Sequence, residues 1–128
     1  MTLKDKIEDY LYKLTLTFQS PSPDTWVIDD DEKGLRNVVV LADEPIVVFR
    51  VKVMDLPANN REEFFEKLLR LNAQDLVHGA YGLEGDSVIL LNTLFAETMD
   101  IEEFQSTLDA LGLALRQHYE ILSKYRKQ

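Results

Sequence analysis

Three segments rich in β-branched residues follow one another between short turns, and they restrict the fold more than any other feature of the sequence. They span about Thr25 to Asp29, Arg36 to Ala42 and Ile46 to Met54. Valine and isoleucine favour strands, and connections this short join neighbouring strands that run in opposite directions. The sequence therefore predicts an antiparallel meander.

Three amphipathic segments with helix-start signals flank the predicted strands. Each begins with two residues spaced as in a capping box, in which two side chains and two backbone amides pair reciprocally. The pairs are Thr2 with Asp5, Asn60 with Glu63, and Asp100 with Glu103. Apolar residues recur behind each pair at helical spacing, as far as Phe18 in the first segment. The prolines in Ser20 to Pro23 predict a loop after this first helix.

Two more strands are predicted between the second and third helices, at about Val77 to Leu83 and Ser87 to Phe95. They are joined through Glu84, Gly85 and Asp86, a connection typical of a hairpin. The order becomes α-β-β-β-α-β-β-α. Runs of adjacent strands favour an α+β fold with an antiparallel sheet, and we interpret residues 1–128 as a single domain.

The strand segments are apolar on both faces. Val38 to Leu41, Ile46 to Phe49 and Val88 to Leu91 have apolar residues at consecutive positions, and successive strand residues point to opposite sides of a sheet. An antiparallel sheet with one solvated face alternates instead. Either the three helices cover both faces between them, or another chain covers one face. The pattern alone favours neither.

Composition excludes several classes of function. The 128 residues have a formal net charge of −9, which repels phosphate backbones, so we expect no nucleic-acid partner. The absence of cysteine excludes disulfides and thiolate zinc sites. The longest purely apolar run, Val38 to Ala42, is too short for a membrane helix, and the first segment is amphipathic rather than a signal peptide. We expect a cytoplasmic protein without a cofactor.

Catalytic and metal-binding candidates are few. His78 and His118 lie forty residues apart, neither has an identifiable nucleophile or metal partner, and we interpret both as structural. The acidic run Asp29 to Glu32 lacks the alternating ligand spacing of a calcium loop and is typical of a solvated hairpin tip. We therefore predict no catalytic, cofactor-binding or metal-ligating residue.

One combination of motifs carries a family resemblance. It consists of Leu71-Asn72, then the run from His78-Gly79-Ala-Tyr-Gly82 through Leu83-Glu-Gly-Asp86 to Leu90, then the capped helix at Asp100. In these motifs, and in its order of elements, the chain resembles the YbjN family and the wider class I type III secretion chaperone-like group. The resemblance implies an α+β fold that dimerises and, in the secretion chaperones, holds an extended segment of a client protein. It does not imply secretion here.

The leading hypothesis is a non-enzymatic protein-binding module, chaperone-like or regulatory, that binds segments of a partner protein as a homodimer. Ile46, Val48 and Met54 are the candidate protein-binding residues, because an even number of positions separates them along one predicted strand and should place them on the same face. From the resemblance, the second helix is the expected dimer interface; its candidate residues are Phe64, Phe65 and Leu68. The main alternative is a structural or assembly subunit whose apolar sheet face serves permanent homo-oligomerisation. An enzyme using His78 or His118 is a distant third.

Overall fold

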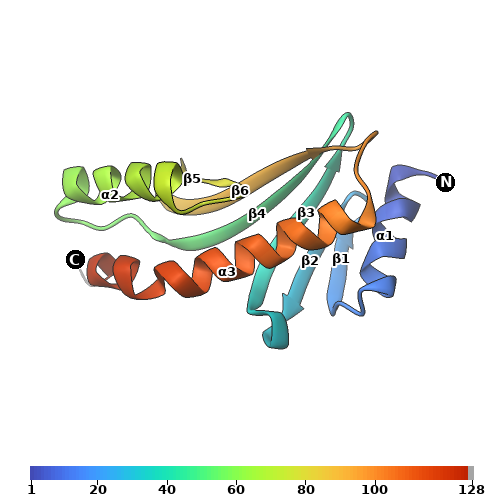
Figure 1. Cartoon of the computed structure of the whole chain (residues 1–128), viewed down its shortest axis with the longest axis horizontal. Helices are drawn as coiled ribbons and strands as arrows, with labels where there is room; N and C mark the ends of the chain where they lie inside the picture. The colour runs from blue at the N-terminus through green and yellow to red at the C-terminus, as the bar shows by residue number, and fades with distance from the viewer. Residues whose placement is uncertain (127–128) are drawn as a thin grey trace.

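The computed structural model describes residues 1–126 and consists of an elongated, twisted sheet with helices packed along it (Figure 1). The helices are α1 (Leu3–Lys13), α2 (Arg61–Gln74) and α3 (Ile101–Arg126). The strands are β1 (Phe18–Ser22), β2 (Thr25–Asp30), β3 (Leu35–Asp43), β4 (Ile46–Asp55), β5 (Ala80–Glu84) and β6 (Ser87–Phe95), with a short 3-10 turn, η1, at Asp31–Lys33. The predicted order is correct except for one additional strand, β1.

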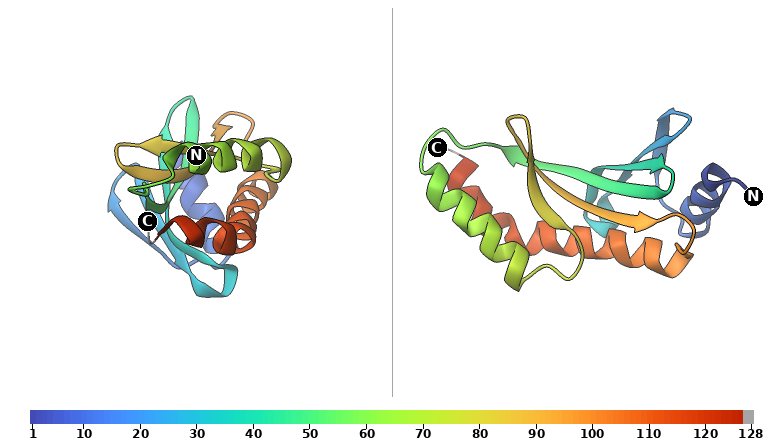
Figure 2. Two further views of the ribbon diagram at one scale, coloured as in Figure 1. Left: turned by 90° about the vertical axis from the view of Figure 1, so that its left-hand side faces the viewer. Right: turned by 90° about the horizontal axis from the view of Figure 1, so that it is seen from above.

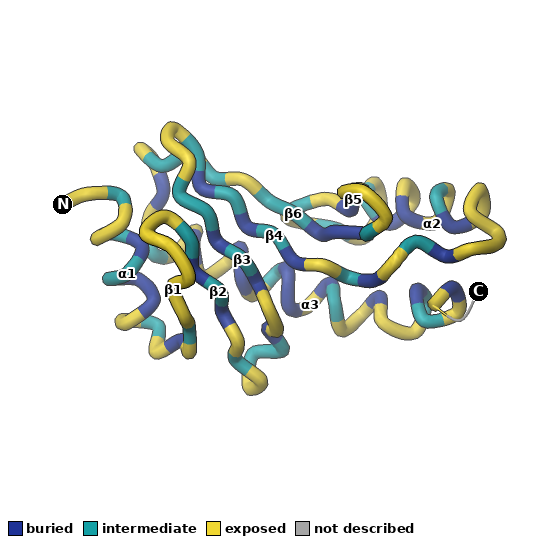
Figure 3. The backbone as a smooth tube through the Cα atoms, turned by 180° about the vertical axis from the view of Figure 1, so that it is seen from behind, coloured by how far each residue is buried: buried dark blue, intermediate teal, exposed yellow. Residues whose placement is uncertain are grey.

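All six strands form one antiparallel sheet in the order β1-β2-β3-β4-β6-β5. The helices of the described chain lie on the same side of this sheet (Figure 2). Figure 3 shows the opposite side, where the strands lie in front of the helices. The α+β, antiparallel prediction is confirmed, and the alternative in which the three helices cover both faces of the sheet is wrong for residues 1–126. Residues 1–126 supply helices for one face of the sheet only.

Helix α1 begins as predicted but ends earlier. The Thr2 hydroxyl accepts a hydrogen bond from the Asp5 backbone N–H, and the Asp5 carboxylate accepts one from the Thr2 N–H. The helix ends at Lys13, because Thr15 adopts a positive φ of 53° that turns the chain. The predicted loop at Ser20 to Pro23 was wrong in part, because Phe18–Ser22 forms the edge strand β1. Proline is tolerated there, since an edge strand has a free hydrogen-bonding side.

The core lies between the sheet and helices α1 and α3. Phe104, in the first turn of α3, is fully buried, with its ring centroid 5.5 Å from that of Tyr10 on α1 and 5.3 Å from that of Phe49 on β4. Trp26 is also fully buried, and its indole N–H donates to the Glu8 carboxylate. Aromatic side chains thus join both helices to the middle of the sheet.

Helix α2 packs at the far end of the molecule, beside β5 and the carboxyl-terminal half of α3 (Figure 2). Phe64 is fully buried, and its ring centroid lies 5.0 Å from that of Tyr125 on α3. The capping box predicted at Asn60 and Glu63 is wrong. Asn60 has a positive φ of 56°, outside the extended conformation of an ordinary N-cap, and makes no side-chain cap hydrogen bond.

Candidate protein-binding surfaces

The face of the sheet away from the helices, which we call the open face, is largely apolar. The strand register aligns its side chains in rows that cross the sheet. In order along β4 the rows are Asp43, Ile46 and Phe95; Thr25, Leu41, Val48 and Thr93; Val27, Val39, Arg50, Leu91 and Ala80; and Lys52, Ile89 and Gly82. Most of its apolar side chains are half-buried by their neighbours, and Phe95 is 69% exposed. The open face is therefore a continuous surface on which another chain has room to pack.

Two of the three candidate binding residues lie on the open face, and the third does not. Ile46 and Val48 share it, as strand alternation predicts. Met54 is 6% exposed and belongs to the core cluster. The register between β4 and β6 shifts between Lys52 and Met54, which pairs Met54 with the buried Val88. This irregularity turns Met54 to the helix side, so the predicted common face was wrong for that residue.

The open face also carries two ion pairs. The Arg50 guanidinium lies 2.9 Å from the Glu84 carboxylate, and the Lys52 ammonium lies 2.7 Å from the Asp55 carboxylate. Arg50 and Lys52 follow Ile46 and Val48 along the same face of β4. The end of the open face beyond Val48 therefore carries both ion pairs.

A second apolar surface lies between α2 and β5. Its depression has a volume of about 230 Å³ and is lined by Phe65, Leu68, Leu69, Tyr81, Gly82 and Leu83. Leu69 is 68% exposed and Leu83 is 50% exposed. Of the three candidate dimer residues, Phe64 and Leu68 are buried within this chain, and only Phe65 retains substantial exposed surface.

Sequence reasoning missed Leu69 and Leu83 as members of this surface. The sequence contains a signal for the first, because Leu69 follows Phe65 by four residues and so shares its helix face. Phe64, Leu68 and Leu71 form a separate stripe that is buried. Leu83 has no comparable signal, since its exposure depends on β5 being an edge strand.

The motif that carried the family resemblance fastens α2 to the outer edge of β5. The Asn72 side-chain amide donates to the Tyr81 carbonyl at 3.2 Å, and its carbonyl oxygen accepts from the Tyr81 N–H at 2.7 Å. The asparagine thus satisfies both backbone groups of Tyr81, as a neighbouring strand would. Gly79 is required just before β5, because its φ is 81° and an added Cβ would lie 2.7 Å from the Leu91 carbonyl oxygen.

Replacing Asn72 with alanine is expected to lower the free energy of unfolding by about 1–3 kcal/mol, because it leaves two partly buried backbone groups without their partner. Urea denaturation monitored by circular dichroism measures the change. Gln74→Ala, at an exposed position of the same helix, is the matched control and should stay within about 0.5 kcal/mol of the wild type. Equal effects of the two variants would contradict the fastening role of Asn72.

His118 is buried, as the helical pattern predicts. It is 2% exposed, and its Nδ1 lies 2.7 Å from the Tyr81 hydroxyl oxygen. Burial, and secondarily the charge of Asp75, raises the pKa of the Tyr81 phenol above its ordinary value. Among the described residues, the imidazole Nε2 has no hydrogen-bond partner, and it lies 3.5 Å from an Asp75 carboxylate oxygen. The depression between α2 and β5 includes Tyr81 but not His118, so a substrate in it would not meet the imidazole.

His78 is exposed at the margin of a shallow depression beside the start of α3. This depression, of about 290 Å³, is also lined by the carboxylates of Asp100, Glu102 and Glu103. Within residues 1–126, His78 forms no hydrogen bond or ion pair with them. The two histidines therefore belong to different surroundings: His118 is buried against Tyr81 and Asp75, whereas His78 is exposed.

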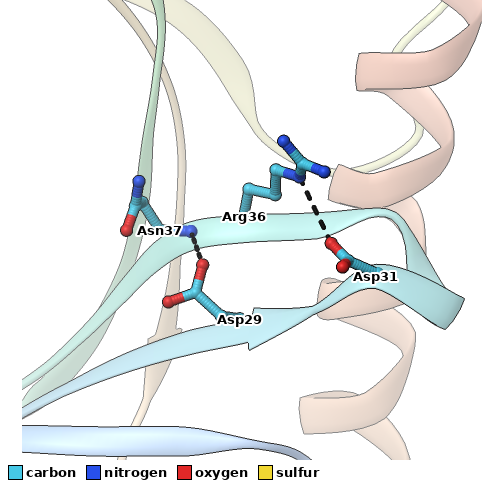
Figure 4. Close-up of polar contacts among 4 residues, drawn as sticks. All are labelled: Asp29, Asp31, Arg36 and Asn37. Carbon is cyan, nitrogen blue, oxygen red and sulfur yellow. Dashed lines mark hydrogen bonds and ion pairs between the residues drawn. The ribbon is translucent and has the colours of Figure 1, made fainter.

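The acidic run at the β2–β3 connection is a hairpin tip whose carboxylates face different partners (Figure 4). The Asp29 carboxylate accepts from the Asn37 backbone N–H at 2.9 Å, and Asn37 has a positive φ of 51°. The Asp31 carboxylate accepts from Arg36 Nε at 3.2 Å. No group of three potential metal ligands is found in the described part of the chain.

Comparison with known proteins places this chain in a family. The CesT_Tir_1 family model matches residues 1–128. The chain belongs to the CesT_Tir_1 family. This is a type III secretion chaperone family, so the wider group named by the motif resemblance is confirmed. The narrower YbjN assignment is not confirmed, because only similarity of fold supports it. No curated protein matches the chain significantly.

Solved structures show the same fold at low sequence identity. A chain of the ExoU–SpcU complex from the type III secretion system of Pseudomonas aeruginosa is 17% identical, with a TM-score of 0.70 over 87% of this chain and 93% of that one. YbjN from E. coli is 10% identical, with a TM-score of 0.67 over 91% and 90%. A chain of the Yersinia pestis chaperone SycH in complex with a fragment of YscM2 is 16% identical, with a TM-score of 0.65 over 91% and 98%.

A search of the described helices for a membrane span finds none, because none of them is both long and apolar enough to cross a bilayer. Even α3, the longest, has many charged residues on its solvent side.

Proposed function

We propose that this CesT_Tir_1 family member is a non-enzymatic, chaperone-like protein that binds segments of a client protein on the open face of its sheet. The observation that carries the proposal is the continuous apolar surface around Ile46 and Val48, which the helices of the described chain leave uncovered. A contiguous apolar surface is typical of a protein-binding site. The absence of cysteine fits a reducing compartment, and we place the activity in the cytoplasm.

The comparisons support a protein client. ExoU–SpcU is a heterodimeric complex from a secretion system, and SycH was solved with a fragment of YscM2, so similar folds occur in complexes with other protein chains. An apolar groove or sheet can take an amphipathic segment, and an exposed edge can take an extended one. We infer the same class of partner here.

We also propose that the protein is a homodimer in which α2 and β5 of each copy pack together. Leu69 and Leu83 expose apolar surface around a depression whose lining is almost entirely apolar, and Phe65 flanks it. A twofold interface uses the same patch on both copies, so one self-complementary surface suffices. This surface is distinct from the open face, which therefore remains available to a client in the dimer.

Leu69→Asp is expected to convert the dimer to a folded monomer at tens of micromolar, because it places a charge in the proposed apolar interface. Phe65→Asp should act in the same direction. Size-exclusion chromatography with light scattering measures the mass, and circular dichroism checks the fold. Phe64→Asp is the contrasting variant and should unfold the protein, because Phe64 is fully buried. A wild-type monomer at this concentration would defeat the proposal.

The rival proposal is a structural subunit whose open face is covered permanently by further copies of itself. The observation in its favour is the same uncovered apolar face. Light scattering of Val48→Asp separates the two, because a permanent assembly through the open face should dissociate on this change, whereas a client-binding dimer should keep its mass.

The most direct test of the binding function is purification of the tagged protein from its native cell, followed by identification of the chains that co-purify. We expect a specific protein client that is retained by the wild type and lost from Val48→Asp. Recovery of the same chains with both variants would place any binding site elsewhere.

A further inference from the structure

A single arginine lies among the apolar side chains of the open face. Register places Val39 on one side of Arg50 and Leu91 on the other, and Val48 precedes it on the same face of β4. The Arg50 side chain is 37% exposed, and its guanidinium contacts Glu84 on the edge strand β5 at 2.9 Å. A cation is thus built into the surface that we propose as the client site.

A client segment that covers this face must remove water from Arg50. A charge that loses water without gaining a partner is strongly unfavourable, so an apolar client residue above the guanidinium would weaken binding, and a basic one would add repulsion. The ion pair with Glu84 does not compensate Arg50 for this loss of water. Glu84 has a 53% exposed side chain, and a pair this exposed contributes little to stability and exchanges readily.

We propose, on the basis of the function inferred above, that the open face selects an amphipathic client segment that places an aspartate or glutamate over Arg50. The client carboxylate takes over the guanidinium from Glu84, while the apolar residues of the segment pack on the rows around Val48 and Ile46. A carboxylate matches the planar guanidinium, because it can accept two parallel hydrogen bonds from it.

The same arrangement sets the direction of the bound segment. Lys52 follows Arg50 on the open face and pairs with the exposed Asp55, whereas Ile46 lies at the opposite end of the face between Asp43 and Phe95. A client segment with its acidic end toward Lys52 and its apolar end toward Phe95 is complementary to both ends of the face. Because the whole chain has a net charge of −9, most of its surface repels an acidic segment, so the local cations define where such a segment binds.

The test uses random peptides displayed on phage and selected against the wild-type protein. We expect the selected peptides to combine apolar residues with one conserved acidic position. Exchange of that residue for its amide, or Arg50→Gln in the protein, should each weaken binding of the synthetic peptide about tenfold, the effect of one charge-assisted hydrogen bond. Both changes together should weaken it no more than either alone, because they remove the same contact.

Two further variants serve as controls. Arg70→Gln, on the exposed side of α2, changes the net charge by the same amount and should leave affinity unchanged. Glu84→Gln removes the competing carboxylate and should strengthen binding of the acidic peptide roughly threefold. Selected peptides that respond equally to Arg50→Gln and Arg70→Gln would overturn the proposal.

Val48→Asp distinguishes failure of this inference from failure of the proposed function. Peptides that are lost on Val48→Asp but indifferent to Arg50→Gln would leave the client site in place and refute the acidic anchor. If selection gave no peptide that depends on Val48, the acidic anchor and the client site on the open face would both be refuted. Both would also be refuted if Val48→Asp changed the mass of the protein without any peptide, because a second copy of the chain would then cover this face.

Discussion

Phe104→Ala is expected to lower the free energy of unfolding by about 3–5 kcal/mol, a large share of the roughly 5–15 kcal/mol that stabilises an ordinary domain. The side chain is fully buried and contacts rings on both α1 and β4, so its removal leaves a cavity at the point where helices and sheet meet. Urea denaturation at a fixed protein concentration measures the change, since the proposed homodimer would make stability depend on concentration.

Phe95→Ala provides the control for this experiment. It removes the same number of atoms from a side chain that is 69% exposed at the end of β6, and its expected effect on stability is within about 1 kcal/mol. If Phe95→Ala destabilised the protein as much as Phe104→Ala, Phe95 would be buried against another surface. Both the core assignment and the proposed client site would then be wrong.

Val48→Asp is expected to weaken client binding about a hundredfold or more, which corresponds to about 3 kcal/mol. Val48 is already half-buried among its neighbours, so loss of its apolar surface contributes only part of the effect. The larger part comes from the introduced carboxylate, which must lose water when the client covers it. Isothermal titration calorimetry of a captured client with the purified variant measures the loss of affinity, after circular dichroism confirms that the variant is folded.

Two variants and one change of solvent control for other causes. Leu113→Asp places the same carboxylate on an exposed leucine of α3, away from the sheet, and should leave binding unchanged. Val48→Thr keeps a branched side chain of similar size and should weaken binding to an intermediate extent. High salt should weaken binding only modestly, because exposed ion pairs contribute about 0–1 kcal/mol. Loss of binding in salt together with full binding by Val48→Asp would refute the apolar mechanism.

Local signals in the sequence predicted most of the elements because they depend on residues close together in the chain. The capping box at Thr2 forms in full, and at Asp100 the carboxylate accepts from the Glu103 backbone N–H, since each bond needs only a side chain and a backbone amide three residues away. The pair at Asn60 fails because the chain enters α2 through a left-handed residue after the long strand β4. Tertiary packing determines the backbone conformation of Asn60, and the local sequence pattern does not predict it.

Strand β1 and the orientation of Met54 were mispredicted for a related reason. Phe18 continues the helical spacing of the first segment, and only the positive φ of Thr15 separates the two. Met54 satisfies strict alternation with Val48, but an irregularity in the pairing of β4 with β6 reverses its side. Both depend on one backbone position, which periodicity averaged over a segment does not resolve.

The candidate sites were predictable only in part. Alternation placed Ile46 and Val48 together, and consecutive apolar residues indicated a sheet with two apolar faces. Which face the helices leave uncovered depends on how three helices pack against one sheet, and this is a property of the whole chain. The same applies to Leu83, whose exposure follows from the position of β5 at the sheet edge.

The central claim, that the client lies on the open face, is tested most directly by methyl NMR of the protein with a captured client. We expect the methyl signals of Ile46, Val48 and Leu91 to shift or broaden on binding, while those of Leu69 and Leu83 remain as in the free protein. Changes confined to Leu69 and Leu83, with Ile46 and Val48 unaffected, would contradict the claim and place the client on the surface between α2 and β5.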